Sequence, residues 1–129
     1  MKYKIFLSFL ALPLITVGIA SGQGERPRRY TVVDVGTLGG TFSAAFGLNE
    51  RGWAAGVANL AGDQQTHAFL DRNGKLTDLG TLGGLNSDVE FTPFRADSTL
   101  TGDSETAESD PNGADFCFHG TQLICRPVV

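Results

Sequence analysis

The heptad DVGTLGG at Asp34–Gly40 returns as DLGTLGG at Asp78–Gly84, identical at six of seven positions and 44 residues further along. Between the copies, short apolar runs alternate with segments rich in Asn, Asp and Gly. The runs are residues 44–48, 53–58, 66–70 and 75–79. Runs of this length bounded by turn residues are typical of β-strands, and Asn73-Gly74 is a strong hairpin signal. The sequence therefore predicts four strands per period.

A period of this length with four strands is typical of a β-propeller blade. We therefore expect an all-β fold of four-stranded antiparallel, blade-like repeats. Each blade buries its faces against its neighbours, so one unit is not stable alone. Two blades cannot close a ring of four or more, so the ring is incomplete in one chain. Three alternatives stay open: a homo-oligomer of identical chains, a remnant of a longer gene, or a smaller β-sandwich.

The repeated heptads are expected to carry the chain from one blade to the next. Their glycine pairs would supply backbone freedom for the turn, and their leucines an apolar plug for the core. A phosphate-binding loop is the rival interpretation, but neither copy has the Lys of a P-loop or the spacing of a dinucleotide fingerprint. The repeat positions are Asp34, Gly36, Leu38, Gly39 and Gly40, then Asp78, Gly80, Leu82, Gly83 and Gly84.

With SAAFGLNERGWAAG at Ser43–Gly56 and THAFL at Thr66–Leu70, the first heptad resembles the HAF repeats of bacterial extracellular proteins. The name of these repeats comes from the tripeptide present here as His67-Ala68-Phe69. The resemblance covers about half of the chain after residue 22. It implies a secreted or surface-associated, β-propeller-like module whose ligands are mostly unassigned, and it brings no catalytic residues.

The second unit departs from this pattern. Thr101–Ser104 aligns with Ala55–Ala58 when two residues are inserted upstream. The tripeptide is absent, and we expect Phe116-Cys117-Phe118 to take its place and His119-Gly120 to take the place of Asn73-Gly74. This gives four segments, which are a signal peptide at 1–22, a flexible basic leader at 23–29, a first repeat at 30–84 and a degenerate second repeat at 85–129.

The N-terminus has the pattern of a secretory signal, with Lys2 and Lys4, an uncharged run to Ala20 and small residues after it. The run is too short, with Pro13 inside it, to favour a membrane anchor. We expect cleavage after Ala20 or Gly22, no membrane span afterwards and a secreted, extracellular or periplasmic protein. The chain after residue 22 has fourteen acidic and eight basic residues, and this negative net charge argues against nucleic-acid binding.

Cys117 and Cys125 are the only cysteines, and in an oxidising compartment they predict one disulfide. If the chain turns at Gly120–Gln122, the two would face each other across a hairpin. A metal site would need two more ligands. A reactive thiol pair would need a stronger basic neighbour than His119 or Arg126 supplies.

An acidic segment suggests a weak calcium site at Glu108, Asp110 and Asn112, because alternating oxygen ligands and a glycine turn are typical of calcium loops. The segment departs from the calcium-loop pattern at two positions: Glu108 stands at the first position, where Asp is usual, and His119 stands at the twelfth, where a bidentate Glu belongs. A β-turn at Asp110–Gly113 inside a solvated loop is the stronger interpretation. No other cofactor is expected.

Two further side chains have alternative roles. His67 could ligate a metal or act as a base, but no nucleophile motif accompanies it, and a structural contact between strands is favoured. Trp53 could stack on a sugar, although core packing is favoured. We expect a non-enzymatic repeat module with an interaction or structural role and an unknown protein or glycan ligand. The alternatives are a calcium-stabilised adhesion module and a fragment of a propeller hydrolase.

Overall fold

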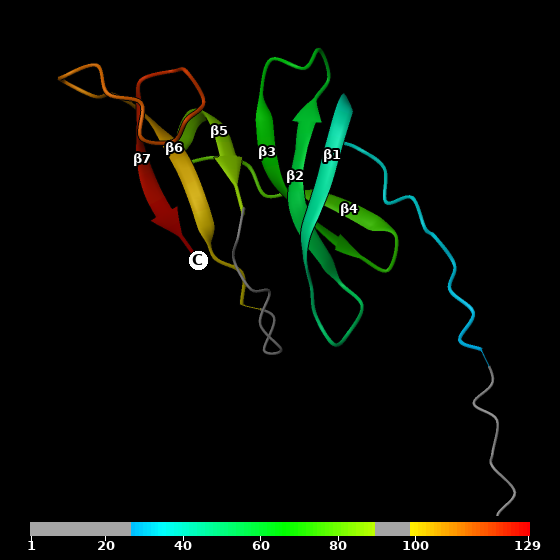
Figure 1. Ribbon diagram of the computed structural model, residues 1–129. Coiled ribbons are helices and arrows are strands. Elements are labelled where there is room, and N and C mark those ends of the chain that lie inside the picture. Colours follow the sequence, from blue (N-terminus) through cyan, green and yellow to red (C-terminus); the bar gives the residue numbers. More distant parts are fainter. Residues whose placement is uncertain (1–26, 90–98) are drawn as a thin grey trace, which may run out of the picture. The chain divides into compact units, whose positions relative to one another are not determined.

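The computed structural model describes residues 27–89 and 99–129, and in these residues the protein is all-β, as expected (Figure 1). Both sheets are antiparallel, and their strands neighbour one another in chain order. The first sheet is β1 (Gly39–Leu48), β2 (Ala54–Leu60), β3 (Thr66–Arg72) and β4 (Lys75–Asp78). The second is β5 (Gly83–Asp88), β6 (Gly102–Ser109) and β7 (Leu123–Val128). The four strands of the first repeat are confirmed, whereas the described part of the second repeat has three.

Turn chemistry closes the hairpins of the first sheet. Asn73 and Gly74 join β3 to β4 with φ angles of 56° and 81°, the left-handed conformation that these residues tolerate best. At the β1–β2 turn, the Asn49 side chain accepts the N–H groups of Arg51 and Trp53 at 3.0 and 3.1 Å. The predicted Asn73-Gly74 hairpin is confirmed.

The second heptad connects β4 of the first sheet to β5 of the second, as predicted. Its two adjacent glycines have different roles. Gly83 has a φ of 102°, which favours glycine, whereas a Cβ on Gly84 would lie 2.4 Å from the Cβ of Glu105. Gly84 therefore permits a close approach of strands and supplies no turn. The prediction that the heptad leucines fill the core is wrong for Leu82, whose side chain is 50% exposed.

The two sheets repeat one geometry. A Cβ on Gly56 would lie 1.9 Å from the carbonyl oxygen of Ala44, and one on Gly102 would lie 2.1 Å from that of Asp88. Gly102 therefore takes the place of Gly56, which confirms the alignment that inserts two residues.

The structure corrects the remainder of that alignment. Gly102 pairs with Val128 in β7, as Gly56 pairs with Phe69 in β3. Residues 126–128, Arg-Pro-Val, therefore stand where His67-Ala68-Phe69 stand in the first sheet. Phe116-Cys117-Phe118 and His119-Gly120 lie in the loop before β7 instead, because the chain forms an irregular loop there and enters a strand only at Leu123.

The core joins the two sheets. Buried Ala55, Ala68 and Leu70 of the first sheet pack with Val89, which follows β5, and Trp53 and Leu100 pack against this cluster. Backbone N–H groups of β3 also donate to side chains of β5: Thr66 to Asn86 Oδ1 at 2.9 Å and Ala68 to Ser87 Oγ at 3.0 Å. Consecutive repeats therefore adhere through both apolar packing and hydrogen bonds.

Candidate functional site

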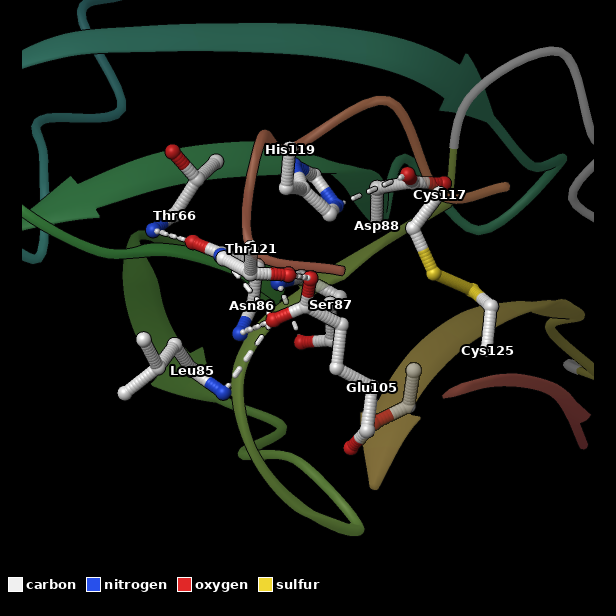
Figure 2. Close-up of polar contacts among 12 residues, drawn as sticks. Thr66, Leu85, Asn86, Ser87, Asp88, Glu105, Cys117, His119, Thr121 and Cys125 are labelled. Atoms are coloured by element: carbon white, nitrogen blue, oxygen red, sulfur yellow. Dashed lines mark hydrogen bonds and ion pairs between the residues drawn. A yellow bond between two sulfur atoms is a disulfide. The ribbon is translucent and has the colours of Figure 1, made fainter. Parts of the chain in front are cut away.

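A fully buried carboxylate organises the second sheet. Glu105 of β6 is 0% exposed, and its Oε2 accepts the backbone N–H groups of Leu85 and Asn86 at 3.2 and 2.9 Å and the Asn86 amide Nδ2 at 3.0 Å. Its Oε1 accepts the Thr121 hydroxyl (Figure 2). A buried carboxylate is costly unless donors surround it, and four donors satisfy this one. Glu105 thus ties β5 and β6 to the loop that precedes β7.

That loop, residues 110–122, is braced at several points and is called the braced loop below. The backbone N–H of Asp110 donates to the carbonyl of Gln122 at 2.8 Å across its base, and Gly120 N–H donates to Asp115 Oδ2 at 2.6 Å. His119 Nε2 lies 3.7 Å from Asp88 Oδ2. These contacts hold a long irregular segment in one conformation.

The predicted Cys117–Cys125 disulfide is present, with 5.7 Å between the Cα atoms. The expected cross-strand hairpin is wrong. Cys125 lies in β7, but Cys117 lies in the braced loop, so the bond ties the loop to the sheet edge (Figure 2). The strand that pairs with β7 is β6, and not a strand that contains Cys117.

The braced loop exposes two phenylalanines. Phe116 is 73% and Phe118 90% exposed, on either side of the disulfide-bonded Cys117. Phe118 also has a φ of 59°, an outlying conformation for a bulky residue that costs on the order of 1–3 kcal/mol. Neither the exposure of these two rings nor the backbone strain at Phe118 stabilises the fold. The braced loop therefore presents aromatic surface to solvent at a cost in free energy.

A second polar arrangement joins the two sequence motifs of the repeat. His67 Nδ1 lies 2.9 and 3.0 Å from the two carboxylate oxygens of Asp78, the first residue of the second heptad. Asp78 Oδ1 also accepts the Gly80 N–H at 2.7 Å. The expected structural contact is therefore to a neighbouring carboxylate and not to a backbone group. A His–Asp pair can also orient a general base.

Two of the three residues of the calcium hypothesis, Asp110 and Glu108, have side-chain contacts of another kind. Asp110 Oδ1 accepts the N–H groups of Asn112 and Ala114 at 2.8 and 3.1 Å, and Gly113 N–H donates to the Asp110 carbonyl at 3.1 Å. Glu108 lies 3.7 Å from Arg126. The turn at 110–113 is as expected, and the described residues contain no cluster of three or more His, Cys, Asp or Glu suited to a metal.

Asp63 performs in the first sheet part of the role that Glu105 has in the second. Its carboxylate accepts the Thr41 N–H at 2.7 Å, the Thr41 hydroxyl at 3.0 Å and the Asn59 amide at 3.1 Å. The backbone hydrogen bond from Thr41, aided by Asn59, holds the pKa of Asp63 below its ordinary value.

Trp53 is part of the core, as favoured from the sequence. Its ring packs against the buried cluster, and the guanidinium groups of Arg51 and Arg72 lie 5.2 and 4.5 Å from the ring centroid. Both guanidinium groups make cation–π contacts with the ring. The Trp53 ring is therefore occupied by contacts within the protein, and stacking on a sugar is not favoured.

The sequence interpretation missed Glu105 and Asn86. Both lie in segments that look solvated, TGDSETAES and LNSD. The only usable signal was the alignment with the first repeat, which sets Glu105 at the position of Asn59 in the middle strand of a sheet. A carboxylate at a central-strand position has to find several donors or face solvent.

Comparisons of the chain with protein-family models, with curated proteins and with solved structures gave no match. The resemblance to HAF repeats therefore rests on the sequence motifs alone. No helix in residues 27–89 and 99–129 has the length and apolar character to cross a membrane.

Proposed function

We propose that this protein is a secreted, non-enzymatic repeat module of the β-propeller type that binds a protein or glycan at the bacterial cell surface. The observation that carries the proposal is the braced loop with Phe116 and Phe118 exposed. A disulfide, the Glu105 network and a backbone contact hold this loop, so its aromatic rings meet a ligand with little further loss of conformational entropy. Aromatic residues are enriched at the energetic centres of interfaces.

The remaining polar side chains support a scaffold role. Asp34, Asp63, Asp78 and Glu105 all accept backbone N–H groups, and each holds a turn or a strand start in place. The disulfide and the N-terminal signal pattern at 1–22 both agree with an extracellular or periplasmic location; residues 1–26 lie outside the described residues. The propeller-type arrangement is supported by two sheets that share one repeated geometry.

Cell-surface binding by the fluorescently labelled, oxidised mature chain tests the proposal. Bacterial cells are titrated before and after surface proteolysis, which separates a protein ligand from a glycan. The variant F116S/F118S removes the aromatic surface and keeps the disulfide, and Leu48→Ser is the control because Leu48 is 71% exposed outside the loop. Binding that the double variant loses and the control keeps supports the proposal. No saturable binding, or equal binding by all three chains, overturns it.

The calcium-stabilised module is a separate candidate, tested by thermal unfolding. A ligand of the native state raises the melting temperature, so millimolar Ca²⁺ would raise it in the wild type and not in Asp110→Ala. Each variant is compared with itself in EDTA, since Asp110→Ala also weakens the turn. The absence of any calcium response in the wild type ends this candidate.

The hydrolase fragment is tested on the His67–Asp78 pair, whose geometry is the one observation that favours it. Turnover of any substrate in a broad hydrolase panel that disappears in His67→Gln would replace the binding proposal with an enzymatic one. Turnover that persists in His67→Gln would exclude this pair as its source.

A further inference from the structure

A continuous row of hydrogen bonds runs from the first sheet into the braced loop. The row begins at Thr66, the first residue of β3, and leaves it in two directions. In the first direction, the Thr66 hydroxyl donates to Asn59 Oδ1 at 2.9 Å, and Asn59 Nδ2 donates to Asp63 Oδ1 at 3.1 Å. Asp63 lies in the turn between β2 and β3, so this arm ties the start of β3 to that turn.

The second direction leads through the second sheet (Figure 2). The Thr66 N–H donates to Asn86 Oδ1 at 2.9 Å, and Asn86 Nδ2 donates to Glu105 Oε2 at 3.0 Å. The Thr121 hydroxyl of the braced loop donates to the other carboxylate oxygen, Glu105 Oε1. The six residues joined in this way are called the polar relay: Asp63, Asn59, Thr66, Asn86, Glu105 and Thr121.

The chemistry of the polar relay fixes the direction of every bond. A carboxylate only accepts and a backbone N–H only donates, so each asparagine turns its amide nitrogen to a carboxylate and its oxygen to Thr66. No other orientation of Asn59 or Asn86 satisfies both of its partners. Asn86 and Glu105 are 6% and 0% exposed, and in such a setting each hydrogen bond strengthens the next. The loss of one link therefore weakens its neighbours.

The polar relay joins equivalent places in the two repeats. Asn59 pairs with Thr66 across β2 and β3, as Glu105 pairs with Cys125 across β6 and β7. The β2–β3 turn, residues 61–65, and the braced loop therefore connect corresponding strands of their sheets. The connection is short in the first repeat, whereas in the second it is longer, is tied by the disulfide and carries the two exposed phenylalanines.

A displacement at Thr66 reaches the braced loop through direct contacts. The hydroxyl bond of Thr66 holds its side chain, and thereby the N–H group of the same residue, in place. A weaker bond from this N–H leaves the Asn86 amide less firmly aimed at Glu105. Glu105 in turn holds Thr121, whose Oγ1 also accepts the N–H of Leu123, at the start of β7, at 3.3 Å. Each step between Thr66 and the start of β7 is therefore a hydrogen bond of the structure.

We propose that the polar relay couples the β2–β3 turn to the braced loop, so that the first repeat controls how firmly the second presents its exposed aromatic rings. Thr66 and Asn86 are the positioning residues of this coupling. Coupling between two places is reciprocal, so a change at the turn alters the stability of the loop, and a change in the loop alters the stability of the turn. The coupling is a property of the free chain, and its test is therefore separate from the test of the proposed ligand.

Amide hydrogen exchange of the oxidised mature chain, resolved by residue with NMR, tests the coupling. Thr66→Val removes the hydroxyl bond and keeps the backbone N–H. It should speed the exchange of two hydrogen-bonded amides in and beside the braced loop, Gly120 and Leu123, at least about threefold, the effect expected of a coupled side chain. Thr66→Ser keeps a hydroxyl and should exchange as the wild type does. Thr77→Val is the control, because Thr77 is an exposed threonine of β4 outside the polar relay.

The reverse experiment reads the first sheet. Thr121→Val should speed the exchange of the Thr66 amide by a similar factor, and Asn86→Ala should abolish the effect of Thr66→Val on the loop. Unchanged exchange of the two loop amides in Thr66→Val overturns the proposal, and so does an equal increase in Thr77→Val or over the whole of both sheets. An effect of Thr66→Val that persists beside Asn86→Ala overturns it as well. If Asn86→Ala does not fold, the Thr66 and Thr121 variants still decide, because an effect in one direction only contradicts reciprocity.

Discussion

Replacing Glu105 tests whether a buried carboxylate holds the second sheet and the braced loop together. Glu105→Ala would leave the Asn86 N–H and the Asn86 amide without an acceptor in a buried setting, and the Leu85 N–H and Thr121 hydroxyl in a partly buried one. Each buried unsatisfied donor costs about 1–3 kcal/mol, and the lost methylenes add to this. We expect Glu105→Ala to lower the free energy of unfolding by about 4 kcal/mol.

Glu105→Gln is the matched control. Its remaining carbonyl oxygen can accept the N–H groups that Oε2 accepts now, and its amide can donate to Thr121, so only the charge assistance of the hydrogen bonds is lost. We expect this variant to cost about 1 kcal/mol.

Urea unfolding, followed by Trp53 fluorescence and by circular dichroism, measures both variants. With a slope of about 1.3 kcal/mol per molar urea, the midpoint should fall by about 3 M for Ala and by less than about 1 M for Gln. If Glu105→Ala does not fold, the Gln variant still decides the question. Equal costs for Ala and Gln, or an Ala variant within about 1 kcal/mol of the wild type, would refute the role assigned to these hydrogen bonds.

Three further predictions concern the strand starts and the loop. Gly84→Ala should cost about 2 kcal/mol or more in urea unfolding, because its Cβ would lie 2.4 Å from that of Glu105; a neutral result would contradict the close approach. Cys117→Ser with Cys125→Ser should cost about 2.5 kcal/mol, chiefly by freeing the unfolded chain, and should increase amide exchange in the braced loop; unchanged exchange would show that the other contacts suffice. Folding lowers the pKa of Asp63, so its stabilisation is present above the ordinary pKa of 3.8 and lost as pH falls below it; in Asp63→Asn the loss of stability between pH 6 and 3 should be smaller, and an unchanged loss would refute this assignment.

Much of the first sheet follows from local sequence. The runs between residues 44 and 79 have strand length, and the turns between them use residues that accept the required angles, Asn73-Gly74 above all. The disulfide also follows from composition, because two cysteines in an oxidising compartment have only each other. These are short-range or pairwise properties that need no knowledge of how the sheets pack.

The second sheet was predictable only in part. Its glycine at 102 revealed the register of β6, but Phe116-Cys117-Phe118 looked like a strand by its apolar pattern. In the structure, Arg126–Val128 occupies the strand position predicted for Phe116-Cys117-Phe118, because residues 126–128 are the ones that pair with β6. A sequence pattern predicts that a strand exists more reliably than it predicts the partner.

The sequence by itself determined the repeat, the strand lengths, the turns and the two cysteines, because these depend on neighbouring residues and on the freedom of glycine and asparagine. Only the tertiary structure decided that His67 meets Asp78, that Glu105 is buried among four donors and that Phe118 points into solvent. The first two depend on strands that bring distant groups together: His67 of β3 reaches Asp78 of β4, and Glu105 of β6 reaches the backbone N–H groups of β5, only when these strands are in register. The exposure of Phe118 depends on the conformation of the braced loop.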